Sequence, residues 1–258
     1  MKKQKPQRPK RKVILFLVEG WSEVTLLKPL MLALYDSIDP EIQVFFSIIE
    51  EDGVNCGGDI TSKFGVYPGN IEKKIYEFFM KTFFSENKLY PKDITEIIHI
   101  VDLDGAYIPD DRILLQPNPK GEDRTYYDKD AILTNKVENI IKRNQRKREN
   151  LDYLMQLSQM KVASKTIKYS VFFFSSNLDH FFCDNANTGN HDKVSYARNY
   201  VCEFENDPQG FVANVKSIDG ILTDMDYEQS WQFIKEGNNS IKRHSNINIL
   251  LDRIINEN

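Results

Sequence analysis

The sequence lacks the motifs of several common functional classes. Its three cysteines, Cys56, Cys183 and Cys202, form no CxxC pair, and an odd number without a secretory signal favours free thiols over disulfides or a zinc cage. The four histidines have neither HxH nor HxxxH spacing, so the common histidine zinc motifs are excluded. A GxxxxGK[ST] sequence is also missing, which excludes a phosphate loop.

Long hydrophobic runs are missing as well. The first apolar run, at residues 13–18, lies behind a basic segment and has only six residues, too few for the core of a signal peptide or for a membrane span. We therefore expect an intracellular, cytoplasmic chain that has no contact with a membrane.

The charge is unevenly distributed. A net charge of −4 argues against a protein that coats nucleic acid by bulk electrostatics. Residues 1–12, however, include seven Lys and Arg and show no apolar periodicity, which predicts a disordered basic tail. A second basic segment, residues 142–148, continues a helical pattern. Either segment can neutralise phosphates or can simply be solvated surface.

The apolar residues predict an α/β fold. Hydrophobic residues make up 41% of the chain, enough for a substantial core. A continuous apolar run of the kind found in doubly buried strands occurs at residues 12–18, and mainly apolar segments at residues 42–49, 96–101 and 167–174 also predict strands. Helical spacing separates them, at residues 22–35, 70–84 and 129–157. We expect an open, mainly parallel four-stranded, Rossmann-like sheet flanked by helices.

The predicted organisation has three parts. The basic tail is followed by an α/β core at residues 13–178 and by a mostly helical C-terminal extension at residues 179–258, which packs on the core. Within the core, residues 110–128 are rich in Pro and Gly and predict a long loop. The helix predicted to begin at Lys129 has a possible break near Asn150.

Polar side chains stand where three of the predicted strands end. Glu19 follows the first strand, Asp102 and Asp104 follow the third, and Ser176 with Asn177 follow the fourth. Ligand sites of open parallel sheets lie at the carboxyl ends of the strands, and two acids before a turn at Gly105 can reach one ion. Carboxylate oxygens suit Mg²⁺ or Mn²⁺, and Glu19 would ligate the metal or transfer a proton.

Two segments resemble the signature motifs of the Toprim domain: LVEGWSE at residues 17–23 and VDLDG at residues 101–105. The resemblance covers about residues 12–178, in a family that includes topoisomerase and primase catalytic domains and OLD-type nucleases. It implies that Glu19 is the general acid or base and that Asp102 and Asp104 bind magnesium, in a nuclease that cleaves phosphodiester bonds.

A third segment, SNLDHFF at residues 176–182, is similar to the SNPxFExW-type segment of RloB-like proteins, which are small Toprim-related proteins found near restriction-modification loci. Leu178 stands where proline is usual and Phe182 where tryptophan is usual. This resemblance implies an anti-phage defence nuclease that acts on RNA, including tRNA, or on DNA, with a possible ATPase partner and possible homo-oligomerisation. Four polar residues after the fourth strand are candidates for substrate binding: Asn177, Asp179, His180 and Lys193.

Two other functions fit parts of the same pattern. IHIVDLDG at residues 98–105 also resembles the haloacid-dehalogenase-type phosphatases, in which Asp102 would be the nucleophile. That family usually has threonine where this chain has Ala106, and it leaves Glu19 without a role. The alternative without catalysis is a Toprim-like module that binds nucleic acid or an ATPase. In that case Glu19 caps a helix and the Asp-Gly pair is an ordinary turn.

Overall fold

The computed structural model describes residues 10–49, 59–117, 121 and 125–256. Its centre is a mostly parallel sheet, which in these residues has five strands in the order β2-β1-β3-β8-β7. The strands are β1 (Lys12–Val18), β2 (Ile42–Ile48), β3 (Ile94–Asp102), β7 (Gln159–Val162) and β8 (Lys165–Phe174). The four predicted strands are confirmed, and all of them run parallel.

The fifth strand corrects the prediction of a four-stranded sheet. β7 pairs antiparallel with β8 as a hairpin at the edge of the sheet. Its turn includes Ala163 in the left-handed region at φ 55°. The segment Gln159–Val162 has only four residues and buries only Met160 and Val162, so its apolar pattern is too short to predict a strand.

Alternation along β1 explains why the sheet is covered on both faces. Successive side chains of a strand point to opposite faces. Val13, Leu15 and Leu17 belong to one core cluster. Ile14, Phe16 and Val18 belong to the other. A strand with two buried faces needs this continuous apolar run.

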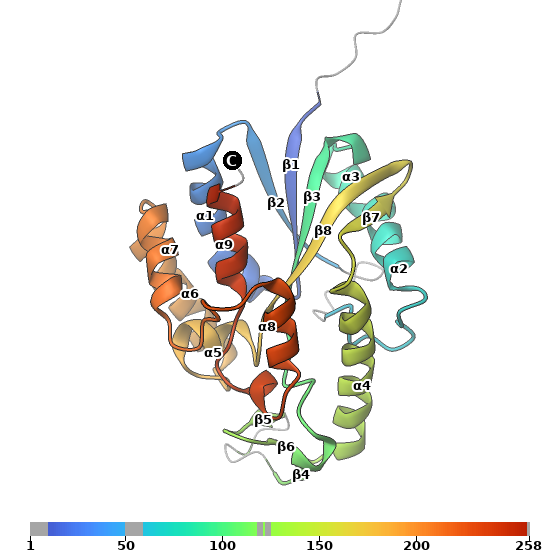
Figure 1. Ribbon diagram of the computed structural model, residues 1–258, viewed down its shortest axis with the longest axis vertical. Coiled ribbons are helices and arrows are strands. Elements are labelled where there is room, and N and C mark those ends of the chain that lie inside the picture. The colour runs from blue at the N-terminus through green and yellow to red at the C-terminus, as the bar shows by residue number, and fades with distance from the viewer. Residues whose placement is uncertain (1–9, 50–58, 118–120, 122–124, 257–258) are drawn as a thin grey trace, which may run out of the picture.

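Helices form the two outer layers (Figure 1). One face carries α1 (Trp21–Ile38), α5 (Leu178–Cys183), α6 (Asn190–Phe204), α7 (Pro208–Ser217) and α9 (Ile247–Asn256). The other face carries α2 (Ile71–Phe78), the π-helical turn Phe79–Phe83, α3 (Phe84–Asn87) and the end of α4 (Val137–Leu154). α8 (Tyr227–Ile234) packs on the same face as α2, in the cluster that includes Val13, Leu15 and Leu17. There Trp231 packs on Phe173 with ring centroids 4.8 Å apart.

The described residues between 110 and 136 depart from the prediction, whereas 118–120 and 122–124 of the predicted loop lie outside the described residues. The described residues form the short strands β4 (Ile113–Leu115), β5 (Tyr126–Tyr127) and β6 (Ile132–Thr134), which pair as a small sheet in the order β4-β6-β5. The helix therefore begins at Val137 rather than Lys129, because the four residues 131–134 are all buried. α4 also continues through Asn150, whose Nδ2 donates to the carbonyl oxygen of Thr61 at 2.8 Å instead of competing for the helix backbone.

The structure describes the basic tail and the cysteines only in part. Residues 1–9 of the predicted basic tail lie outside the described residues, and Lys12 is the first residue of β1. Cys183 and Cys202 are free, as predicted, whereas Cys56 lies outside the described residues. Of the helices that the structure describes, none has both the length and the hydropathy needed to cross a membrane.

Candidate functional site

The candidate site lies at the carboxyl ends of β1, β3 and β8, at the lower end of the sheet in Figure 1. The chain turns there under close backbone control. The N–H of Leu103 donates to the carbonyl oxygen of Phe174 at 2.8 Å, and the N–H of Asp104 donates to that of Ser176 at 2.9 Å. These bonds extend the pairing of β3 with β8 beyond the regular strands, so the aspartates project from a fixed turn.

Glu19 and Asp102 connect the ends of the three strands. The backbone N–H of Asp102 donates to Oε1 of Glu19 at 2.9 Å, which ties the end of β1 to the end of β3. Oδ1 of Asp102 accepts from the backbone N–H of Leu178 at 2.9 Å, which ties β3 to the start of α5. Both carboxylates are therefore held by backbone donors, and the structure brings together the predicted residues.

Asp104 has an unusual backbone conformation. Its φ of 52° lies in the left-handed region, which aspartate tolerates better than most residues. Gly105 follows with a φ of 66°, and a Cβ there would lie 3.2 Å from Cδ1 of Ile132. This turn directs the Asp104 carboxylate toward α4 and β5, where Oδ1 accepts from the hydroxyl of Tyr127 at 2.9 Å.

A lysine from α4 lies among three carboxylates. The side chain of Lys147 is fully buried, and its Nζ is 2.8 Å from Asp104 Oδ2, 3.0 Å from Asp59 Oδ2 and 3.4 Å from Glu19 Oε1. We call Lys147, Glu19, Asp59 and Asp104 the Lys147 group. The solvated-surface interpretation of residues 142–148 is therefore wrong for Lys147, which supplies the positive charge of this group.

The pKa of Asp104 is lowered within this group. Burial alone would raise it, but the ammonium of Lys147, the guanidinium of Arg143 and the bond from Tyr127 outweigh that effect. Burial likewise disfavours a charged Lys147, yet Asp104, Asp59 and Glu19 hold its pKa well above the usual range. Asp104 and Lys147 therefore form a buried ion pair that stays charged at neutral pH.

Glu19 behaves differently although it contacts the same lysine. Burial and the nearby carboxylate of Asp59 hold the pKa of Glu19 well above its usual range, and the attraction of Lys147 does not offset them. One ammonium cannot neutralise three buried carboxylates. Glu19 therefore holds a proton more readily than an exposed glutamate does.

A second set of charges surrounds Asp102. Burial, followed by repulsion from Glu23 and Asp104, holds the pKa of Asp102 well above its usual range. Burial and repulsion from Asp179 also raise the pKa of Glu23, which is 5% exposed. The positive charge of this set comes from Lys193, whose Nζ lies 2.6 Å from Asp179 Oδ2. We call Asp102, Glu23, Asp179 and Lys193 the Asp102 group.

The chemistry of these donors fits a hard divalent cation. The acids of the Asp102 group offer carboxylate oxygens, which Mg²⁺ and Mn²⁺ prefer. A nearby cation would lower the raised pKa values of Asp102 and Glu23. Among the described residues, no three His, Cys, Asp or Glu side chains converge closely enough to hold a metal on their own. A bound ion would therefore use one or two carboxylates together with water, as Mg²⁺ usually does.

The four predicted substrate-binding residues have different positions. Asn177 caps α5: its Oδ1 accepts from the N–H of His180 at 2.8 Å, and its Nδ2 donates to the carbonyl oxygen of Ala186 at 2.9 Å. Its side chain is thus used to position the start of α5. Asp179 and Lys193 pair within the Asp102 group. His180 lies one residue further along α5 and lines a separate pocket.

Sequence reasoning gave no role to Glu23, Asp59 or Lys147. Glu23 lies in the first turn of α1 and is the last residue of the LVEGWSE motif that contains Glu19. Lys147 had a usable signal, because it falls on the same helical stripe as Leu151 and Leu154, and a lysine on a buried stripe needs carboxylate partners. Asp59 follows a glycine-rich connection that carries no periodic pattern, so nothing in the sequence indicates its position.

Comparisons with known proteins do not extend this description. No model of a protein family, no curated protein and no solved structure matches the chain. The geometry and charges of the site are therefore the basis for its proposed function.

Proposed function

We propose that this protein is a metal-dependent nuclease of the Toprim type, which hydrolyses phosphodiester bonds of RNA or DNA at the strand ends. One observation supports this proposal above the others: the carboxylates of partly buried Asp102 and buried Glu23 repel each other, and the pKa of each is raised. Such an arrangement is costly unless the pair gains a positive charge. A divalent cation would supply this positive charge, and the bound cation could in turn bind a substrate phosphate.

Asp102 and Glu23 are the residues that would hold the cation, with Asp104 close by on the next turn. A bound Mg²⁺ or Mn²⁺ would neutralise charge on the non-bridging phosphate oxygens and lower the pKa of a bound water. Asp102 is positioned for this role by the N–H of Leu178, which holds Oδ1 at 2.9 Å.

Glu19 is the candidate for proton transfer. The backbone N–H of Asp102 and the ammonium of Lys147 both contact Oε1, so this oxygen is fixed and Oε2 can carry the proton. A carboxyl whose pKa is raised well above its usual range is suited to act as a general acid or base. The contact with Asp102 also gives Glu19 a role that the phosphatase alternative does not provide.

Two lysines can stabilise the charge that develops during cleavage. Lys193 is partly exposed and its pKa is raised, because its pairing with Asp179 outweighs burial. It can therefore stay charged and approach a phosphate from the open side. Lys147 is buried behind the carboxylates and holds Asp104 and Glu19 in place. The role in anti-phage defence and the ATPase partner are predictions that rest only on the resemblance to RloB-like proteins.

Cleavage assays test the proposal. Purified protein is incubated with mixed RNA and DNA in Mn²⁺, and the wild type is compared with Glu19→Gln and with the matched control Glu86→Gln, an exposed glutamate on α3. We expect metal-dependent cleavage that Glu19→Gln lowers by a factor of about 100 or more and that Glu86→Gln leaves unchanged.

Two outcomes would contradict the proposal. Phosphomonoester hydrolysis that survives Glu19→Gln but not Asp102→Asn would favour the phosphatase, in which Asp102 is the nucleophile. Absence of cleavage, together with absence of Mn²⁺ binding at millimolar concentration, would favour a module that binds nucleic acid or a partner without catalysis.

A further inference from the structure

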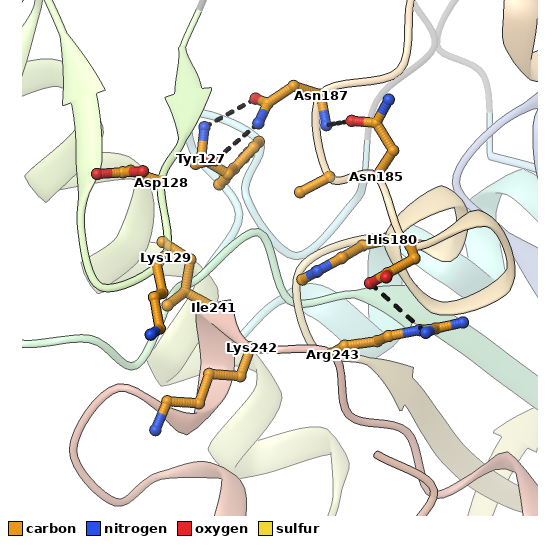
Figure 2. Close-up of a pocket in the computed structure, with 11 residues that line it drawn as sticks. Tyr127, Asp128, Lys129, His180, Asn185, Asn187, Ile241, Lys242 and Arg243 are labelled. Atoms are coloured by element: carbon orange, nitrogen blue, oxygen red, sulfur yellow. Dashed lines mark hydrogen bonds and ion pairs between the residues drawn. The ribbon is translucent and has the colours of Figure 1, made fainter. Parts of the chain in front are cut away.

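A pocket of about 380 Å³ is lined in part by Tyr127 (Figure 2), whose hydroxyl contacts Asp104. Its walls come from three segments: residues 127–129 between β5 and β6, His180 with residues 184–187 after α5, and residues 241–243 before α9. We call it the basic pocket. Its volume is within the range of small-ligand sites. No residue of the Lys147 group or of the Asp102 group lines it.

Tyr127 separates the basic pocket from the Lys147 group. Its hydroxyl donates to Asp104 Oδ1, whereas its backbone is held from the pocket side by Asn187. Oδ1 of Asn187 accepts from the N–H of Tyr127 at 2.8 Å, and Nδ2 donates to its carbonyl oxygen at 2.7 Å. A ligand in the pocket therefore lies one side chain away from the proposed cleavage site.

Positive charge exceeds negative charge in the pocket lining. Lys129, Lys242 and Arg243 stand against Asp128 and Asp184, and Arg243 is paired with Asp184 at 3.5 Å. Figure 2 shows Lys129 and Lys242 extending toward the same rim. Both lysines are exposed, and within the described part of the chain neither has an ion pair. The chain as a whole has a net charge of −4, so this cationic rim is a local feature.

His180 contributes an unused polar atom. Its ring projects into the pocket in Figure 2, and its Nδ1 is buried with no hydrogen-bond partner in the described structure. Burial lowers the pKa of His180, so the ring is neutral at physiological pH. Because Nδ1 has almost no accessible surface, a ligand in the pocket would meet the outer part of the ring instead.

The cationic segment is anchored to the same strand end as the carboxylates. Nε of Arg243 donates to the carbonyl oxygen of Phe181 at 2.9 Å. The N–H of His244 donates to Oγ of Ser175 at 2.8 Å, and the N–H of Ser175 donates to the carbonyl oxygen of His244 at 2.9 Å. Lys242 and Arg243 thus have a fixed position relative to the end of β8, as preorganised recognition requires.

We propose that the basic pocket binds one phosphate-bearing nucleotide of the nucleic-acid strand, next to the phosphodiester that is cleaved. Lys129 and Lys242 contact its phosphate, and the part of the His180 ring that lines the pocket contacts its sugar or base. The inference rests on the proposed function for the identity of the substrate. It adds a binding subsite that contains none of the proposed metal ligands.

Binding without cleavage tests this inference. Fluorescence anisotropy of labelled single-stranded RNA and DNA oligomers is measured in EDTA, for the wild type and for Lys129→Glu/Lys242→Glu. The matched control is Lys92→Glu, an exposed lysine before β3 at the opposite end of the sheet. We expect the double variant to bind at least about tenfold more weakly, with a salt dependence shallower by about two ions. Lys92→Glu should change affinity less than about twofold.

A competition experiment identifies the group that is recognised. A nucleoside 5′-monophosphate should displace the oligomer from the wild type more effectively than the matching nucleoside does, because the nucleoside has no phosphate for the two lysines. Equal competition by both would overturn the assignment of the phosphate to the pocket. Equal affinity losses in the double variant and in Lys92→Glu would overturn the pocket itself.

The two proposals can fail separately. Cleavage by the wild type together with normal binding by the double variant would disprove the subsite and leave the nuclease intact. Selective loss of binding in the double variant, with no cleavage by the wild type in any metal, would disprove the nuclease and leave the subsite. A thermal unfolding curve for each variant checks that both lysine substitutions leave the fold unchanged.

Discussion

Asp102 and Asp104 are two residues apart, yet they lie in opposite electrostatic environments. Asp104 contacts a fully buried ammonium and a tyrosine hydroxyl, and its pKa is lowered. Asp102 is held by a backbone N–H and faces other carboxylates, and its pKa is raised. The chain neutralises one aspartate with its own lysine and leaves the other short of positive charge. The difference indicates that the Asp102 group is the place for an external cation.

Catalysis should show the largest difference between the two aspartates. We expect Asp102→Asn to lower metal-dependent cleavage at least about a thousandfold, which is roughly 4 kcal/mol of transition-state stabilisation. Asp104→Asn should cost about tenfold, because Asp104 is already neutralised by Lys147. Single-turnover cleavage rates at saturating Mn²⁺ measure both. Equal losses would show that the aspartates act as equivalent metal ligands, as the motif alone implies.

The two lysines provide a comparison of stability. Lys147→Met leaves three carboxylates without their shared ammonium, and we expect it to lower the free energy of unfolding by about 4 kcal/mol. Lys193→Met leaves one buried carboxylate, that of Asp179, without its partner, and because Lys193 itself is partly exposed it should cost less, about 2 kcal/mol. Urea denaturation at pH 7 measures both values. Similar losses would contradict the view that the Lys147 group depends on its own buried ammonium more than the Asp102 group depends on Lys193.

Isosteric amides should change stability with opposite signs. Ionised Asp104 is stabilising, because its pKa is lower in the fold. That contribution is present above the unfolded pKa of about 3.9 and is lost as the pH falls through the folded value. Asp104→Asn should therefore cost about 2 kcal/mol at pH 7.

Ionised Asp102 is destabilising, because its pKa is higher in the fold. The destabilisation is absent below a pH of about 3.9 and grows as the pH rises toward the folded value. Asp102→Asn should thus raise the free energy of unfolding at pH 7, and the gain should shrink toward pH 4. Denaturation curves between pH 4 and pH 8 give both profiles, and a loss of stability in Asp102→Asn at pH 7 would refute the assignment.

The last comparison concerns Tyr127, which lies between the Lys147 group and the basic pocket. Tyr127→Phe removes one hydrogen bond to the Asp104 carboxylate and should lower the free energy of unfolding by about 1.5 kcal/mol. The control is Tyr126→Phe, because adjacent strand residues point to opposite faces. If both substitutions cost the same amount, the bond to Asp104 contributes nothing specific.

Much of the fold can be predicted from this sequence because its strands are buried on both faces. Residues 13–18 are apolar without interruption and residues 97–101 are interrupted only by His99, and only a doubly covered strand needs such a run. The small sheet near residues 113–134 could not be predicted in the same way. Its strands have two or three residues, and Ile132 and Leu133 fit a helical stripe as well as a strand.

The site was predictable only in part. Glu19, Asp102 and Asp104 follow strands, so the topology of a parallel sheet brings them to one edge. The sequence cannot show that Asp104 is paired with a lysine 43 residues later, because such a contact depends on how α4 packs. The basic run at residues 142–148 looks like solvated surface until the helix is placed, when Lys147 is found to point inward.

Binding of Mn²⁺ measured by titration calorimetry tests the central claim, that the Asp102 group is the cation site, most directly. The wild type, Asp102→Asn and Asp104→Asn are titrated under identical conditions without nucleic acid. We predict binding by the wild type, a loss of affinity of at least about a hundredfold in Asp102→Asn and less than about tenfold in Asp104→Asn. Unchanged binding in Asp102→Asn, or a larger loss in Asp104→Asn, would contradict the account.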